Sequence, residues 1–145
     1  MKTKLYTDLI EKQRQELSDF PIAYAFDEKQ LKEALKKLGA KKDECVTVFG
    51  HGDIVKKVDA KRLVDMLKRH TAEIKDKLIE DKDFAEAAFL YEMDNHEYAI
   101  NWSGDVDVLS CFGLDKKDLV ELGLDAVYRR ARDQHFKNAE EWGII

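Results

Sequence analysis

The chain has 145 residues, of which 44% are hydrophobic and 38% are charged, and its formal net charge is −5. That length is typical of one domain, and such a chain buries roughly two thirds of its unfolded surface, enough for a core of its own. The acidic balance argues against general nucleic-acid binding, because non-specific affinity for a polyanion comes from neutralising phosphates with Lys and Arg.

The sequence contains no segment typical of a secretory signal or a membrane span. The longest uncharged apolar run, FPIAYAF at residues 20–26, is far shorter than the roughly 20 residues that cross a bilayer. Cys45 and Cys111 have no CxxC spacing and lie among apolar residues, so we expect two reduced core thiols. These features predict a cytoplasmic protein without a membrane partner.

Two helices, a short strand and a hairpin are predicted in the first half. Residues 3–18 form an amphipathic pattern whose apolar positions are Leu5, Leu9, Ile10 and Leu17. Pro21 ends this helix by Asp19, and PIAYAF then suits a short buried strand. Asp27, with Gln30 three residues on, begins a helix over 28–38 that ends at Gly39. ECVTVF and DIVKKV, joined across GHG, predict a β-hairpin.

The second half is predicted to be mainly helical. A helix of about 20 residues begins near Asp59, and Asp83 caps a second one over FAEAAFLYEM. YAINW, at residues 98–102, predicts a third strand. A short helix then ends at Gly113, and the last helical stretch begins at Asp115 and is interrupted at Gly123. The fold class is therefore α+β, a single helix-dominated domain over 1–145 with a small antiparallel sheet of two to four short strands.

Asn95, His96 and Glu97 form the most polar stretch after the predicted helix over FAEAAFLYEM. HEYAI lacks the second histidine of the zinc-protease pattern, and adjacent residues of a strand point to opposite faces, so His96 and Glu97 are poorly placed to share an ion. His51 and Asp53 lie on a glycine-flanked turn without the GK[ST] of a phosphate loop. The best functional arrangement would pair them with His96 and Glu97, but a helix end and a hairpin turn explain both stretches more simply.

DVDV, at residues 105–108, offers two acids on an extended segment, with carboxylates about 7 Å apart on one face, suited to Mg²⁺. The four residues resemble the metal-binding element of nucleotidyltransferases, which implies Asp105 and Asp107 as ligands. The Gly-Ser pair that precedes the acids in that superfamily is missing here. We favour a helix start with Asp105 or Ser103 as cap, which also explains Gly113.

The only basic cluster with aromatic residues is YRRARDQHFK, which supplies Arg129, Arg130 and Arg132 as candidate phosphate contacts. The alternative, which we favour, is a helix end whose bases complement the helix dipole and the nearby acids. His70 lies on the apolar stripe of its helix and is expected to be a core or boundary residue.

Several stretches together resemble a family of small uncharacterised proteins of Firmicutes bacteria and their phages or mobile elements. The resemblance rests on Ala25-Phe26, Leu38-Gly39, Gly50 to Gly52, and Asn95 to Tyr98, and it spans about residues 20–115. It implies a cytoplasmic accessory protein and carries no activity or functional residue.

The sequence is compatible with three alternative functions of different classes. The first is a non-catalytic interaction module that binds a protein partner or a second copy through spare apolar residues, such as Trp142, Ile144 and Ile145, without a cofactor. The second is a metal-dependent hydrolase or phosphoryl- or nucleotidyl-transfer enzyme that uses Asp105 and Asp107, or the two histidine loops. The third is a nucleic-acid contact through the basic C-terminal helix. We favour the first, because no motif in the sequence is specific for a chemical reaction.

Overall fold

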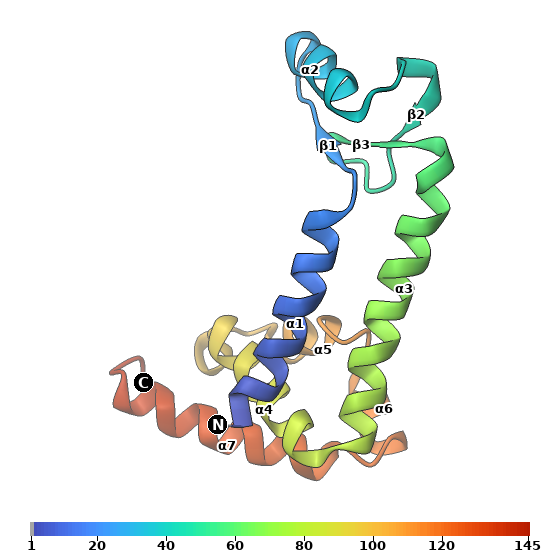
Figure 1. Ribbon diagram of the computed structural model, residues 1–145. Coiled ribbons are helices and arrows are strands. Elements are labelled where there is room, and N and C mark those ends of the chain that lie inside the picture. The colour runs from blue at the N-terminus through green and yellow to red at the C-terminus, as the bar shows by residue number, and fades with distance from the viewer. Residues whose placement is uncertain (1) are drawn as a thin grey trace. The chain divides into compact units, whose positions relative to one another are not determined.

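The computed structural model describes residues 2–145, and the predicted α+β class is confirmed (Figure 1). Helices dominate, and the only strands in the described chain form one small antiparallel sheet. The α-helices are α1 (Lys2–Asp19), α2 (Glu28–Leu38), α3 (Lys57–Glu80), α4 (Lys82–Asn95), α5 (Gly104–Ser110), α6 (Lys116–Glu121) and α7 (Asp125–Glu141). The 3₁₀ helices are η1 (Lys42–Glu44) and η2 (Tyr98–Ile100), and the strands are β1 (Ala23–Tyr24), β2 (Cys45–Val46) and β3 (Asp53–Lys56).

Internal contacts divide the chain into two compact units, and the division falls within α1 and within α3. We call Lys12–His70 the sheet unit, and Met1–Glu11 with Thr71–Ile145 the helical unit. The sheet unit has 14 Lys and Arg against 10 Asp and Glu, whereas the helical unit has 11 against 20. The acidic character of the chain therefore lies in the helical unit alone.

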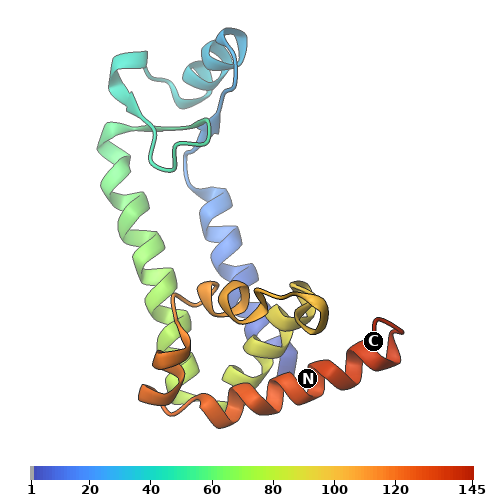
Figure 2. The same ribbon diagram turned by 180° about the vertical axis from the view of Figure 1, so that it is seen from behind.

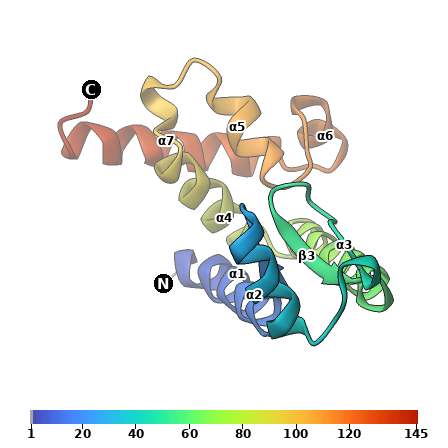
Figure 3. The same ribbon diagram turned by 90° about the horizontal axis from the view of Figure 1, so that it is seen from above.

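In the sheet unit the strand order is β1-β3-β2, with Ala23 opposite Ile54 and Cys45 opposite Lys56. Helix α2 packs against β1 and β3; Figure 3 views the chain from above, with α2 and β3 labelled. The apolar side chains of the unit form two clusters. The buried members are Ile22, Val55, Leu63 and Met66 in the first, and Ala23, Ala34 and Leu38 in the second.

The ends of α2 agree with the sequence prediction. The side chain of Asp27 accepts a hydrogen bond of 2.7 Å from the Gln30 N–H, and the Gln30 side chain accepts one of 2.8 Å from the Phe26 N–H. Gly39 ends the helix in the left-handed conformation, with φ 63°. Local hydrogen bonds therefore fix both ends of this helix, as the sequence predicts.

The predicted β-hairpin is confirmed, but its first strand is much shorter than ECVTVF. Strand β2 stops at Val46 because the carboxylate of Asp53 accepts the backbone N–H groups of Val48 and Phe49. Those donors are then not available to the sheet, and residues 47–52 form a loop in which Gly50 and Gly52 have positive φ.

In the helical unit α4 packs against α7, and α5 and η2 pack against α4 (Figure 2). The core is rich in aromatic rings that meet edge to face, including Phe89 with Phe112 at 5.3 Å and Phe89 with Tyr128 at 5.1 Å between centroids. Tyr6 of α1 belongs to this core and is 4% exposed, whereas its neighbour Leu5 is 47% exposed. The apolar stripe predicted for α1 was therefore wrong at Leu5.

Three further expectations need correction. YAINW is not a strand: Glu97 takes the left-handed conformation, Tyr98–Ile100 forms η2, and the Ala99 N–H is bound by His135 of α7. Helix α4 is capped by Asp81, which accepts the N–H groups of residues 83 and 84, so Asp83 lies inside the helix. Cys111 is exposed and Cys45 is half-buried, so neither is a fully buried core thiol.

The short helices of the second half begin and end close to the residues that the sequence predicts. Asp115 and Asp118 form a reciprocal capping box at the start of α6, and Gly123, with φ 69°, separates α6 from α7. Helix α5 ends at Ser110, three residues before Gly113. None of the helices in residues 2–145 combines the length and the apolar character that crossing a membrane requires.

Candidate functional site

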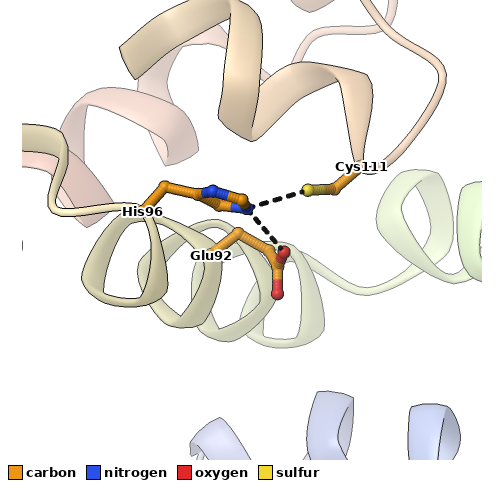
Figure 4. A group of neighbouring side chains, drawn as sticks. All are labelled: Glu92, His96 and Cys111. Carbon is orange, nitrogen blue, oxygen red and sulfur yellow. Dashed lines mark hydrogen bonds and ion pairs between the residues drawn. The ribbon is translucent and has the colours of Figure 1, made fainter. Parts of the chain in front are cut away.

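The last turn of α4 carries Glu92 and His96 on one side, because residues four apart on a helix lie one turn above each other. Cys111 follows the end of α5 and faces the same place. The His96 imidazole lies between the other two side chains (Figure 4). Its Nε2 is 3.5 Å from Glu92 Oε2 and 3.4 Å from Cys111 Sγ, and the three potential ligand atoms lie within 4.8 Å of one another. We call these three residues the Glu–His–Cys cluster.

The electrostatics of the cluster centre on Glu92, which is only 7% exposed. Burial, and then the charge of this carboxylate, raises the pKa of the Tyr6 phenol. The sulfur of Cys111 points toward the His96 ring although the residue as a whole is exposed (Figure 4). Burial of this thiol, followed by its interaction with the nearby Glu92 carboxylate, raises the pKa of Cys111 to about 12. The thiol therefore keeps its proton at neutral pH.

A second layer of hydrogen bonds holds the loop between His96 and α5. The Asn101 amide donates to the His96 carbonyl at 3.1 Å and to Asp107 Oδ2 at 2.9 Å. The Asn101 side-chain oxygen in turn accepts the Ser103 N–H at 3.0 Å. Hydrogen bonds from Asn101 and Ser103 lower the pKa of Asp107, and the Asp107 carbonyl lies 3.3 Å from Cys111 Sγ. The loop is thereby hydrogen-bonded both to the end of α4, which carries Glu92 and His96, and to α5, which precedes Cys111.

The same loop and the first turn of α5 present apolar side chains to solvent. Trp102 is 99% exposed, Ile100 is 58% exposed and Val106 is 69% exposed. We call these three residues the Trp102 surface. Val106 also borders a hollow of about 300 Å³ whose other apolar lining residues are Leu109 and Leu114.

Of the three polar residues predicted at 95–97, only His96 belongs to the Glu–His–Cys cluster. Asn95 ends α4 and is exposed, and Glu97 is exposed with φ 51°. Sequence reasoning missed Glu92 and Cys111. The spacing of four between Glu92 and His96 was a usable signal, whereas nothing in the sequence brings Cys111 to them.

The two acids of DVDV lie on α5 and bind different partners. Asp105 Oδ1 accepts the phenols of Tyr98 at 2.6 Å and Tyr128 at 2.7 Å, and its Oδ2 is 2.9 Å from Lys116 Nζ. Asp107 is held by Asn101 and Ser103. Ser103 precedes the helix but makes no side-chain cap hydrogen bond, and both acids lie within the first turn. Each carboxylate is thus engaged in holding its own part of the fold.

His51 and Asp53 belong to the sheet unit, and His96 and Glu97 to the helical unit. The His51 side chain is exposed, and its backbone N–H donates to Asp53. Burial alone would raise the pKa of Asp53, but the N–H groups of Phe49, Val48 and His51 and the Thr47 hydroxyl lower it to about 2. Asp53 therefore organises the hairpin loop.

The three arginines of the basic cluster lie on α7. Arg129 is 3.5 Å from Asp125, and Arg130 is 3.9 Å from Glu86. Arg132 lines a hollow of about 290 Å³ together with Arg129, Lys116, Asp105 and Asp125. Acidic side chains thus lie close to the basic side chains of this part of α7.

Two buried histidines tie distant segments together. His135, 1% exposed, contacts Asp94 through Nδ1 at 2.6 Å and accepts the Ala99 N–H on Nε2 at 2.9 Å. Its proton therefore lies on Nδ1. His70 is 7% exposed, as a boundary position predicts, and its Nε2 is 3.1 Å from Glu16.

The fold and site define a helix-dominated α+β protein with a Glu–His–Cys cluster beside a loop that presents a tryptophan. The chain belongs to the family described as "Family of unknown function (DUF7659)", whose model matches residues 5–132 and so covers most of both units. No curated protein and no solved structure matches the chain.

Proposed function

We propose that the chain is a non-catalytic interaction module that binds a protein partner through the Trp102 surface. The observation that carries this proposal is the 99% exposure of Trp102, a side chain that proteins normally bury at least in part. Single exposed apolar residues are common on protein surfaces. Here three of them, Ile100, Trp102 and Val106, fall within seven residues of one loop and helix start.

The rigidity of the loop supports this function. Asn101 and Ser103, on either side of Trp102, are hydrogen-bonded to each other and to Asp107. Gly104 is buried, and a Cβ there would lie 2.7 Å from the Tyr98 ring. A tryptophan on a pre-ordered loop loses little conformational freedom on binding, and this is how hot-spot residues reach high affinity.

The charge of the helical unit indicates the chemistry of the partner. With 20 acids against 11 bases, this unit favours a partner that surrounds an apolar pocket with Lys and Arg. If two copies of the chain bound each other through their Trp102 surfaces, two acidic units would come together. Repulsion between like charges disfavours such a dimer. We therefore commit to a different protein as partner, and a homo-oligomer is the competing outcome.

We propose that the protein works in the cytoplasm. An acidic chain with two free thiols suits the cytoplasm, and the resemblance noted above supports a bacterial or phage accessory protein. A nucleic-acid contact through Arg129, Arg130 and Arg132 is not favoured, because acids accompany these bases. A hydrolase or transferase that uses Asp105 and Asp107 is not favoured either, since their carboxylates bind different partners.

Affinity capture from a bacterial lysate tests the Trp102 surface with Trp102→Ala and the control Val120→Ala, which trims another exposed apolar side chain of the same unit. A partner identified by mass spectrometry is then purified and titrated. We expect Trp102→Ala to weaken its binding about 30-fold or more, the loss of about 2 kcal/mol typical of a hot spot. Val120→Ala leaves the affinity unchanged, and added salt weakens binding.

Two results would overturn the proposal. One is a partner that binds wild type and Trp102→Ala equally. The other is a sedimentation mass of two or more chains that returns to one chain in Trp102→Ala, which would make the partner a second copy.

A further inference from the structure

We propose that Glu92, His96 and Cys111 bind one divalent transition-metal ion of the zinc class, with one coordination position left to solvent. This inference is independent of the Trp102 surface, because it concerns an ion and not a protein partner. It rests on the types of the three donor atoms, on their separations and on the hydrogen bonds that hold them.

The donor set favours zinc over the hard cations. A thiolate, an imidazole and a carboxylate are the three ligand types that proteins use for Zn²⁺, whereas Mg²⁺ and Ca²⁺ prefer oxygen alone. The spacing of Glu92 and His96 on α4 places two of the donors on one helix face, and Cys111 supplies the third from the end of α5.

The separations suit a single ion. Metal–ligand distances of about 2.0 to 2.3 Å in a tetrahedral site place neighbouring donor atoms roughly 3.3 to 3.6 Å apart. His96 Nε2 is 3.5 Å from Glu92 Oε2 and 3.4 Å from Cys111 Sγ. The same nitrogen thus faces both other donors, as Figure 4 shows. Only small side-chain adjustments would be needed to admit an ion.

Neighbouring groups hold the donors in place, as second-shell groups do in metal sites. Cys111 Sγ lies 3.3 Å from the Asp107 carbonyl, to which the thiol donates. The His96 backbone is fixed by its N–H bond to the Glu92 carbonyl at 2.9 Å and by the Asn101 amide at its own carbonyl. These hydrogen bonds reduce the conformational freedom that would be lost when an ion binds.

Charge balance also favours binding at this place. When the ion binds, the S–H bond of Cys111 breaks, a metal–sulfur bond forms and the proton leaves to the solvent. The two negative ligands then neutralise the divalent ion, and a neutral site suits a partly buried position better than a lone charge does.

The competing explanation is a hydrogen-bonded cluster that never holds a metal, because a thiol that donates to the Asp107 carbonyl and lies beside His96 gives similar contacts. Cobalt(II) distinguishes the two, since it replaces zinc and has visible bands that are intense only in tetrahedral sites, and a thiolate ligand adds a charge-transfer band in the near ultraviolet. The full chain is stripped with a chelator, titrated with Co²⁺, and then titrated with Zn²⁺ in competition with a chromophoric chelator.

We expect one ion per chain, the thiolate–cobalt band, and its loss when Zn²⁺ is added. Cys111→Ser and His96→Gln should each lower the affinity about 100-fold or more. Cys45→Ser is the matched control, because Cys45 lies in the sheet unit, and it should keep the affinity of the wild type.

Far-UV circular dichroism and urea unfolding of the metal-free variants check that each is folded, and Cys111→Ser is a conservative change at an exposed residue. A chain that gives no thiolate band with Co²⁺, or one that loses the band in Cys45→Ser and keeps it in Cys111→Ser, would overturn the inference. Neither result bears on the Trp102 surface, which is tested by partner binding.

Discussion

The phenol of Tyr128 on α7 donates a hydrogen bond of 2.7 Å to Oδ1 of Asp105 on α5, across 23 residues of sequence. Tyr98 donates to the same oxygen at 2.6 Å. One carboxylate oxygen thus joins η2, α5 and α7. Burial of the two phenols, followed by their hydrogen bonds to Asp105, raises their pKa values, that of Tyr98 to about 12, so both remain donors at any physiological pH.

Replacement of Asp105 is therefore expected to destabilise the helical unit. Asp105→Ala leaves two partly buried phenols without their acceptor, and hydrogen bonds to a charged group contribute about 1.5 to 3 kcal/mol each. We expect urea unfolding to show a loss of about 3 kcal/mol. Asp133→Ala, an exposed change on α7, is the control and should stay within about 0.5 kcal/mol. Equal stability of the two variants would contradict the role given to Asp105.

Because of Asp53, the free energy of unfolding is expected to fall as the pH is lowered into the acidic range. Its folded-state pKa, about 2, lies below the usual value of 3.8, so its contribution is fully present above about pH 4 and is lost as pH falls from there through 2. A shift of this size corresponds to about 2 to 3 kcal/mol.

Urea unfolding at a series of pH values measures this contribution as the difference between wild type and Asp53→Asn, which cancels the effect of other carboxylates. We expect the difference to be largest at neutral pH and to shrink toward pH 2. His51→Ala is the control, because that side chain is exposed, and its curve should follow the wild type. A pH-independent difference between wild type and Asp53→Asn would be inconsistent with this assignment.

Gly52 is expected to tolerate a side chain less well than Gly50. Both have positive φ, 81° and 77°, so alanine costs roughly 1 kcal/mol at either position. At Gly52 a Cβ would also lie 2.6 Å from the Phe26 ring and 3.1 Å from the Ala25 carbonyl, whereas nothing lies within 4 Å at Gly50. Thermal unfolding should therefore give a lower Tm for Gly52→Ala than for Gly50→Ala. The reverse order would show that the packing of Phe26 on Gly52 contributes little.

We propose that the two units unfold together as the single domain predicted over 1–145. Helices α1 and α3 are continuous through the division between the units, and a helix is a cooperative structure. Both tryptophans belong to the helical unit, whereas far-UV circular dichroism reports on all helices. Tryptophan fluorescence and circular dichroism should give the same urea midpoint. Separate midpoints would mean two domains.

The sequence by itself determined the features that depend on neighbours in the chain. The ends of α2 follow from Asp27, Gln30 and Gly39, and the start of α6 follows from Asp115 and Asp118, because a cap is made within one helical turn. The α+β class followed from the periodicity of apolar residues for the same reason.

Only the tertiary structure decided the features that need a partner from far along the chain. YAINW has the composition of a strand, yet His135 of α7 takes the Ala99 N–H and η2 forms instead. Cys111 joins Glu92 and His96 only because α5 packs against α4. Packing between distant segments chooses which donors and acceptors meet, and no spacing within a short stretch encodes that choice.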